Sequence, residues 1–255
     1  MPTNSIGSRW RQLGAWLGGT AVVLTLLVTS RAITATAQEC IPLPDSEYGT
    51  LPVNPPPTDP PAGQHPDLNL AMRGYAITAG RRELINLNGD SDPAAPQLAG
   101  LFGDARTPTF TTLYKVHDWD WRLARPGEVL TRPHTSLLGV ATIPDEVLRV
   151  PDSGYTLGNG FEVLVLYVAP TRVTLKYTAD DNVVEGYTLH VENVCVDPAL
   201  LALYEASEAG GRSRLPALRP GQPFARALGS EIGIAIRDRG SFMDPRSRKD
   251  WWQGR

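Results

Sequence analysis

Hydrophobic and polar residues alternate along several short stretches of the chain. Val173, Leu175 and Tyr177 alternate with polar side chains, and so do Tyr187, Leu189 and Val191. An alternation with a period of two is typical of a strand that has one face in the core and one in water. The polar set that we expect to face solvent comprises Arg172, Thr174, Lys176, Thr188, His190 and Glu192.

Other stretches predict further strands and one helix. Residues 110–116, 136–143, 161–168 and 231–237 are rich in residues that favour strands, and the polar residues 180–182 join the two alternating strands as a hairpin. Residues 198–209 predict the only clear helix, because Asp197 can cap it and Pro198 suits its first position. The predicted fold is therefore mainly β, a short-strand barrel or sandwich with one short helix.

The first 37 residues are typical of a signal peptide. Arg9 and Arg11 precede an uncharged stretch, residues 12–30, and Ala35-Thr36-Ala37 follows as a small-x-small cleavage pattern. We expect cleavage after Ala37 and an extracytoplasmic protein. The alternative is an uncleaved membrane anchor, because the uncharged stretch is nearly long enough to span a bilayer.

The rest of the chain divides into three parts by composition. Nine of the 23 prolines lie in residues 41–66, so residues 38–64 predict an extended spacer, or else a segment that wraps around the domain. Residues 65–245 form the predicted β domain. Residues 246–255 form a basic, aromatic tail that either contacts an anionic wall polymer or lipid headgroups, or folds back onto the domain.

Charge and cysteine content exclude several classes of protein. The chain of 255 residues has a formal charge of −3, and without its first 37 residues it has 21 basic and 27 acidic residues, a net of −6. A nucleic-acid partner is therefore not expected. Two cysteines are too few for a disulfide-dense fold or a zinc module, and in an exported protein they predict a Cys40–Cys195 disulfide.

The C-terminal part contains several motifs in a particular order. Leu203-Tyr204-Glu205-Ala206-Ser207 precedes Pro220-Gly221-Gln222, then Gly229-Ser230-Glu231-Ile232-Gly233, and finally Arg239-Gly240 with Asp244-Pro245. Residues 65–70, with the sequence HPDLNL, come much earlier. This order resembles the lysostaphin-type, or LytM-like, zinc metallopeptidases. The resemblance covers residues 187–245 well and residues 65–70 weakly, and residues 72–150 have no counterpart.

The resemblance implies a barrel but not the activity of the family. Those enzymes bind zinc through a His and an Asp in the first motif and through the second His of an H-x-H strand, and two more His assist the water. Here only His65 is preserved, and Asn69, Ala206, Glu231 and Gly233 stand at the other positions. Because a catalytic zinc needs three protein ligands, we expect no metal, no cofactor and no catalytic residue of this type. The five residues are the candidate lining of a retained groove.

Three functions follow as alternatives. The first is a non-catalytic protein that binds peptidoglycan, a wall polysaccharide or an envelope protein, with membrane contact only through an uncleaved N-terminus. The second is a wall or glycan hydrolase that uses carboxylates such as Asp118, Asp120 or Glu231. The third is a carbohydrate-binding module in which Trp119 and Trp121 stack on a sugar, although aromatic residues at a spacing of two are usually core residues.

Overall fold

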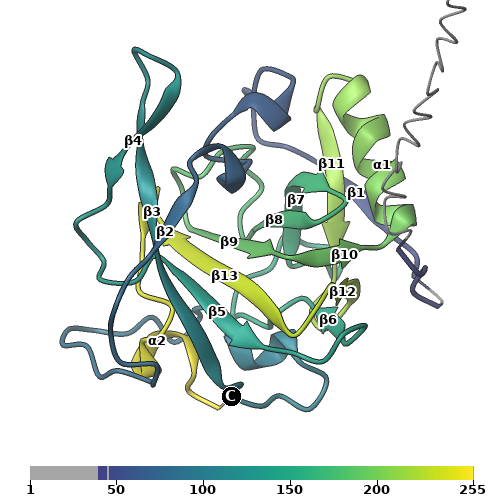
Figure 1. Cartoon of the computed structure of the whole chain (residues 1–255). Helices are drawn as coiled ribbons and strands as arrows, with labels where there is room; N and C mark the ends of the chain where they lie inside the picture. The colour runs from purple at the N-terminus through teal and green to yellow at the C-terminus, as the bar shows by residue number, and fades with distance from the viewer. Residues whose placement is uncertain (1–39, 45, 255) are drawn as a thin grey trace, which may run out of the picture. The chain divides into compact units, whose positions relative to one another are not determined.

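The fold is mainly β. The structure, a computed structural model, describes residues 40–44 and 46–254, which Figure 1 shows coloured along the chain. The predicted signal peptide, residues 1–37, lies outside the described residues, so cleavage after Ala37 stays a prediction. Within the described ranges, no helix has the length and apolar character needed to cross a membrane.

Eleven strands form one large antiparallel sheet, and three form a smaller one. The large sheet runs in the order β1 (Gly49–Pro52), β11 (Arg214–Leu218), β7 (Val163–Ala169), β8 (Arg172–Lys176), β9 (Tyr187–Glu192), β13 (Glu231–Asp238), β5 (Leu137–Ala141), β3 (Phe110–Asp120) and β2 (Tyr75–Ile77), with β14 (Ser241–Phe242) on β13 and β4 (Arg125–Val129) on β3. The small sheet runs β10 (Val194–Val196), β12 (Pro223–Ala227), β6 (Val147–Arg149). Among these strands the large sheet stays open, with β1 and β2 at its ends, so two sheets are present and no closed barrel.

Short helices complete the described fold. They are η1 (Ala62–Gln64), η2 (Leu70–Met72), η3 (Leu98–Leu101), α1 (Pro198–Ala209) and α2 (Arg248–Trp251). The prediction of a helix over residues 198–209 is confirmed, and the Asp197 carboxylate caps it by accepting a hydrogen bond of 2.8 Å from the Ala199 N–H. The predicted hairpin is also confirmed as β8 and β9, in which Val173 lies opposite Val191. Both predictions depend on residues that are close together in sequence.

The residues without a counterpart in the resembled family belong to the same two sheets. Residues 72–150 supply β2 to β6, and β5 pairs with both β3 and β13. This region is therefore continuous with the rest of the domain.

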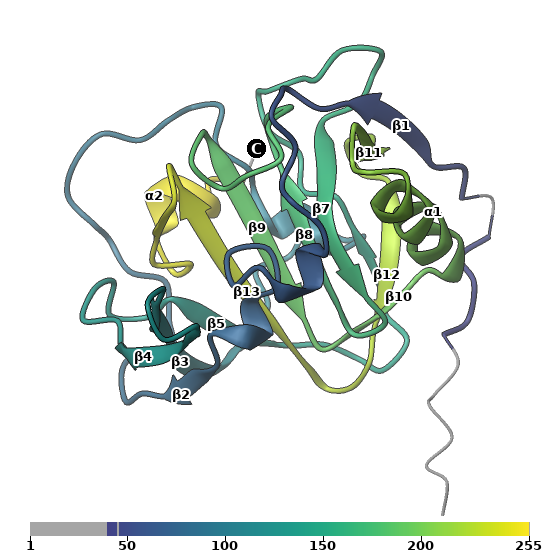
Figure 2. The same cartoon turned by 90° about the horizontal axis from the view of Figure 1, so that it is seen from above.

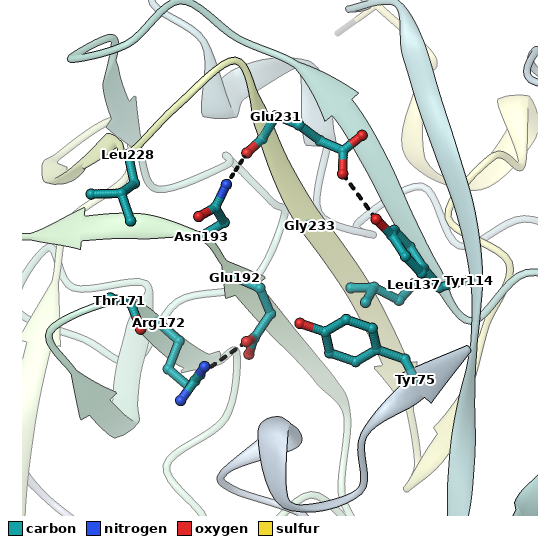
Figure 3. Close-up of a pocket in the computed structure, with 10 residues that line it drawn as sticks. All are labelled: Tyr75, Tyr114, Leu137, Thr171, Arg172, Glu192, Asn193, Leu228, Glu231 and Gly233. Carbon is teal, nitrogen blue, oxygen red and sulfur yellow. Dashed lines mark hydrogen bonds and ion pairs between the residues drawn. The ribbon is translucent and has the colours of Figure 1, made fainter. Parts of the chain in front are cut away.

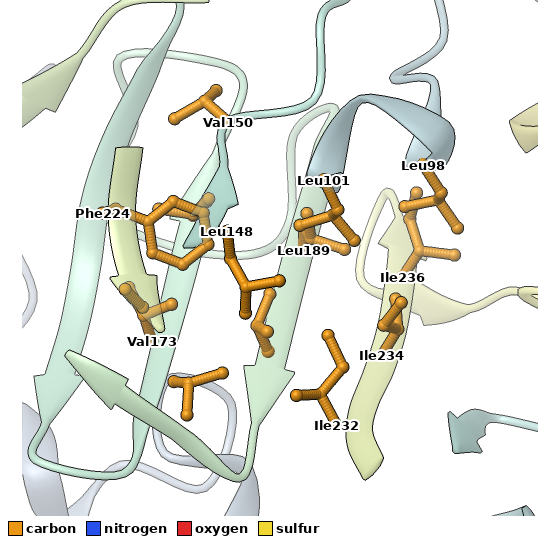
Figure 4. Close-up of a cluster of buried hydrophobic side chains, with 14 of the residues drawn as sticks. Leu98, Leu101, Leu148, Val150, Val173, Leu189, Phe224, Ile232, Ile234 and Ile236 are labelled. Carbon is orange, nitrogen blue, oxygen red and sulfur yellow. The ribbon is translucent and has the colours of Figure 1, made fainter. Parts of the chain in front are cut away.

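The main core lies between the two sheets. Ile232, Ile234 and Ile236 point from one face of β13 toward Leu148 of β6 and Phe224 of β12, all of them fully buried (Figure 4). Each such side chain contributes on the order of 1.5–3 kcal/mol when it leaves water. This alternation leaves Glu231, Gly233, Ala235 and Arg237 on the other face of β13.

Most of the polar face of β8 and β9 is buried, so the prediction that these residues face water is wrong for all of them except the partly exposed Arg172. Thr174, Lys176, Thr188 and His190 are at most 2 % exposed. The segment between β1 and β2, with η1 and η2, crosses this face (Figure 2), and the Thr174 hydroxyl donates a hydrogen bond of 2.7 Å to the Leu68 carbonyl. Alternation separates two faces of a strand, but the covering segment comes from a distant part of the chain.

The proline-rich segment lies along the domain. The Cys40–Cys195 disulfide is present and confirms the predicted pair. The Leu43 N–H donates to the Asp197 carboxylate at 2.9 Å, and β1 pairs with β11 at the edge of the large sheet. Of the two predictions for this segment, the wrapping one therefore agrees with the structure and the projecting spacer does not. The disulfide also indicates an oxidising environment, as outside the cytoplasm.

The C-terminal tail folds back onto the core. Trp251 and Trp252 are 2 % and 6 % exposed, and their indole N–H groups donate to the carbonyls of Asp244 and Pro245. The ring of Trp252 lies 5.7 Å from that of Phe110. Of the two predictions for residues 246–255, folding back is therefore the one observed, and both tryptophans are core residues.

Candidate functional site

A polar pocket of about 330 Å³ opens on the face of β13 that carries Glu231 and Gly233. Figure 3 shows its lining, to which β2, β3, β5, β8, β9 and β13 each contribute. The lining residues are Tyr75, Tyr114, Leu137, Thr171, Arg172, Glu192, Asn193, Leu228, Glu231 and Gly233. We call it the Glu192–Glu231 pocket.

Three hydroxyl groups hold the Glu231 carboxylate. Its oxygens accept hydrogen bonds from Thr111, from Thr112 at 2.8 Å and from Tyr114 at 3.0 Å. The neighbouring strand makes room with Gly139, where a Cβ would lie only 2.7 Å from the Glu231 Cδ. Hydrogen bonds to an ionised carboxylate are stronger than those between neutral groups, so this side chain is fixed in one orientation.

The second carboxylate, Glu192, is paired with a cation. Its Oε2 accepts a hydrogen bond of 2.9 Å from the Arg172 Nε, and its side chain is only 5 % exposed. Burial raises the pKa of Glu192 above its usual value, and the Arg172 charge only partly offsets this. Burial, followed by the charge of Glu192, also raises the pKa of Tyr75, which extends toward it from β2 in Figure 3.

The floor of the pocket depends on a glycine. Gly233 lies opposite Glu192 in the β9–β13 register, and a Cβ there would come within 3.2 Å of the Glu192 Cβ and of a Leu137 methyl. A larger residue at 233 would therefore crowd the space between the two carboxylates. The lining holds two carboxylates and one guanidinium, a net charge of −1, beside two tyrosine rings whose centroids are 5.4 Å apart. Such a surface suits a ligand with hydrogen-bond donors or positive charge.

The structure brings together two of the five predicted groove residues. Glu231 and Gly233 line the pocket, whereas His65, Asn69 and Ala206 do not. His65 and Asn69 share one turn, in which the Asn69 N–H donates to the His65 carbonyl at 2.8 Å and the Asn69 amide donates to the Gly63 carbonyl at 2.9 Å. Ala206 lies on the exposed side of α1.

A catalytic zinc does not fit this donor set. Glu231 supplies the one carboxylate at the predicted metal positions, and three hydroxyls already occupy it. Gly233 has no side chain, and Asn69 lies outside the pocket. Within the described ranges, no three His, Cys, Asp or Glu side chains are grouped so that they could hold a metal ion.

The remaining carboxylates of the hydrolase alternative lie away from this pocket. The Asp118 side chain is 71 % exposed, 3.5 Å from the Arg73 guanidinium. Asp120 accepts hydrogen bonds from the backbone N–H groups of Arg122 and Leu123 in the turn between β3 and β4. Neither residue lines the pocket that contains Glu231.

The two tryptophans of the carbohydrate-binding alternative have different environments. Trp119 is 8 % exposed, whereas Trp121 is 62 % exposed and lies with its ring centroid 5.7 Å from that of His65. β3 ends at Asp120, so the strand alternation that would place both rings on one face does not continue to Trp121. Only Trp121 offers an exposed ring.

Four lining residues, Tyr75, Tyr114, Arg172 and Glu192, are not among the site residues predicted from the sequence. The Arg172–Glu192 pair had a usable signal, because the register of the predicted hairpin places these residues opposite each other. The tyrosines come from β2 and β3, and no local pattern connects them to β9 or β13.

Comparison with family models, with curated proteins and with solved structures finds no match to the chain. The chemistry of the pocket is therefore the basis on which a function can be proposed.

Proposed function

We propose that the protein is exported and acts as a non-catalytic binding or scaffolding protein of the cell envelope. The Cys40–Cys195 disulfide supports an oxidising compartment, and the uncharged residues 12–30 before Ala35-Thr36-Ala37 support a signal peptide. The proposed partner is peptidoglycan, a wall polysaccharide or another envelope protein. Membrane contact would come only from an uncleaved N-terminal segment.

The Glu192–Glu231 pocket is the proposed binding site. The observation that carries this proposal is the convergence of two carboxylates, a guanidinium and two tyrosines from separate strands on one open pocket. The resemblance to the lysostaphin-type metallopeptidases adds support, because Glu231 and Gly233 stand where that family has its H-x-H strand. On this proposal the pocket keeps the two β13 positions of that motif, whereas His65, Asn69 and Ala206 lie outside it.

The ligand is expected to donate hydrogen bonds. Carboxylates accept but do not donate, and the lining has a net charge of −1, so hydroxyl and ammonium groups suit it better than phosphates. Wall glycopeptides carry both kinds of group.

Sedimentation of the protein with purified peptidoglycan tests this proposal. Tyr75→Ala removes a pocket ring from an edge strand and is expected to weaken binding roughly tenfold, as loss of an aromatic anchor does. Ile77→Ala is the matched control, because Ile77 lies on the same strand, is 76 % exposed and is outside the pocket. Equal binding by both variants would place the ligand elsewhere. Near-stoichiometric zinc after incubation and desalting would refute the assignment of lost ligands.

A glycan or wall hydrolase is the second candidate. Glu192 and Glu231 share one pocket, burial raises the pKa of Glu192, and a pair of carboxyl groups in one pocket is typical of acid–base catalysis. Release of reducing ends or peptides from peptidoglycan, abolished by Glu231→Gln, would favour this function over the non-catalytic one.

A further inference from the structure

A second cavity, of about 250 Å³, lies beside β14 and is lined by three arginines. Arg73, Arg132 and Arg237 face it, together with Asp118, Ser241 and Phe242. Its charge is opposite to that of the Glu192–Glu231 pocket. It therefore suits a different class of ligand.

Two of these arginines are buried and share one carboxylate oxygen. Asp67 Oδ1 lies 2.7 Å from the Arg73 Nη2 and 2.8 Å from the Arg237 Nη1. The two arginine side chains are only 7 % and 5 % exposed. One carboxylate, 16 % exposed, is thus shared by two guanidinium groups and balances only one of their two charges. The nearby Asp118 is 71 % exposed, so solvent screens its charge.

The pKa values agree with an excess of positive charge. Burial opposes ionisation of Asp67, but the charges and hydrogen bonds of Arg237 and Arg73 outweigh it and hold the pKa of Asp67 below its usual value. Burial also lowers the pKa of Arg237, and the Arg73 charge acts in the same direction against Asp67. A further anion would relieve this repulsion.

The guanidinium groups are held in place. The Phe242 ring centroid is 4.6 Å from the Arg237 Cζ and 6.0 Å from the Arg73 Cζ. The Arg237 Nε donates to the Gly240 carbonyl at 2.9 Å. Its Nη2 also donates to the Gly240 carbonyl and its Nη1 to Asp67, so three of the five N–H donors of Arg237 are engaged and two are left for a ligand.

The third arginine is exposed. Arg132 lies at the rim of the cavity, and no ion pair to it occurs in the described part of the chain. Counting Arg73, Arg132 and Arg237 against Asp67 and Asp118 leaves one positive charge in excess. This excess matches an oxyanion with a single negative charge.

We propose that this cavity binds an oxyanion, a phosphoryl or carboxylate group, between Arg132 and the buried arginine pair. Planar guanidinium groups bind such anions through charge-assisted hydrogen bonds, and the contacts to Asp67 and Gly240 hold the Arg237 guanidinium in one orientation beside the cavity. The Ser241 hydroxyl at the rim is a further donor. This site does not depend on the function proposed for the Glu192–Glu231 pocket.

Calorimetric titration of the mature protein with inorganic phosphate, acetate and chloride at equal ionic strength tests the proposal. Saturable binding of phosphate or acetate beyond chloride supports it, and the anion that binds identifies the group. The backbone amide signals of Gly240 and Ser241 are expected to shift in a parallel NMR titration. The absence of saturable binding by both anions would overturn the site.

Two variants locate the binding. Arg132→Gln is expected to weaken it roughly tenfold or more, the loss typical of one hydrogen bond to a charged group. Because Arg132 is exposed, this change leaves the fold intact. Arg82→Gln removes an exposed arginine outside the cavity and should leave the affinity unchanged. Undiminished binding by Arg132→Gln, or an equal loss in Arg82→Gln, would overturn the proposal.

Discussion

His190→Leu is expected to remove an acid-sensitive component of stability. His190 is 0 % exposed, and its Nδ1 lies 3.0 Å from the Thr174 hydroxyl. Because that hydroxyl donates to the Leu68 carbonyl, we infer that Nδ1 carries the proton and donates to the Thr174 oxygen. Nε2 has no hydrogen-bond partner among the described atoms. Burial, with the charges of Arg237 and Arg73, lowers the pKa of His190 to about 3.

The sign and the size of the effect follow from this pKa. An unfolded histidine titrates near 6.5, so between this value and about 3 the unfolded state binds more protons than the folded state. The stability contributed by the neutral imidazole is complete above 6.5 and decreases as the pH falls. Between about pH 7.5 and about pH 5 the loss from this one residue is about 2 kcal/mol.

Another buried group acts in the opposite direction. Burial raises the pKa of Glu162 from 4.5 to about 7, so its protonation stabilises the folded state as the pH falls through that range. The two effects are similar in size, so the pH profile of the wild-type protein alone is not diagnostic. The difference in unfolding free energy between the wild type and His190→Leu isolates the histidine.

Urea unfolding of both proteins at the two pH values measures this difference. The stability advantage of the wild type over His190→Leu should decrease by about 2 kcal/mol on acidification. His134→Gln, at an exposed histidine, is the control and should show no such change. A difference that is the same at both pH values, within roughly 0.5 kcal/mol, would refute the assignment of a buried neutral imidazole.

Three further changes test the packing of the chain. The double variant Cys40→Ser/Cys195→Ser opens a loop with a sequence separation of 155. Its free energy of unfolding should fall by up to roughly 5 kcal/mol and its thermal midpoint by about 10–20 °C. An unchanged midpoint would show that the pairing of β1 alone holds the N-terminal segment. Arg212→Met leaves the Asp181 carboxylate, which is 0 % exposed, without its ion-pair partner. Urea unfolding should therefore show a free energy of unfolding lower by about 3–5 kcal/mol, and an unchanged value would contradict a buried ion pair. Truncation before Trp251 should uncover the core and increase binding of a hydrophobic dye, whereas no increase would mean that Trp251 and Trp252 do not seal it.

Local chemistry made part of the fold predictable. The start of α1 follows from Asp197 and Pro198, which act within one turn of the helix that they begin. Strands β8 and β9 and the hairpin that they form follow from an alternation that extends over a few residues. The Cys40–Cys195 pair follows from the number of cysteines and the expected compartment. The helix and the hairpin need no contact between distant segments, and the distant cysteine pair was predictable because the chain has only two cysteines.

The tertiary structure decided which surfaces of the strands are covered. The pattern separates the two faces of β9 correctly, yet His190 is buried because η1 and η2 cross the face that was expected to be wet. The proline-rich segment has the composition of a spacer, but β11 offers it an edge on which to pair. In both cases the partner is remote in sequence, so its effect is absent from the local pattern.

The sequence by itself therefore determined the mainly β class, the single clear helix, the cysteine pair and the polar character of Glu192 and Glu231. Only the tertiary structure placed these two carboxylates in one pocket, because the register of β9 against β13 sets Gly233 opposite Glu192 and leaves the space between them open. It likewise brought Arg73 and Arg237 onto the same carboxylate oxygen. A side chain's type is a local property, whereas its neighbours depend on how strands far apart in the chain align.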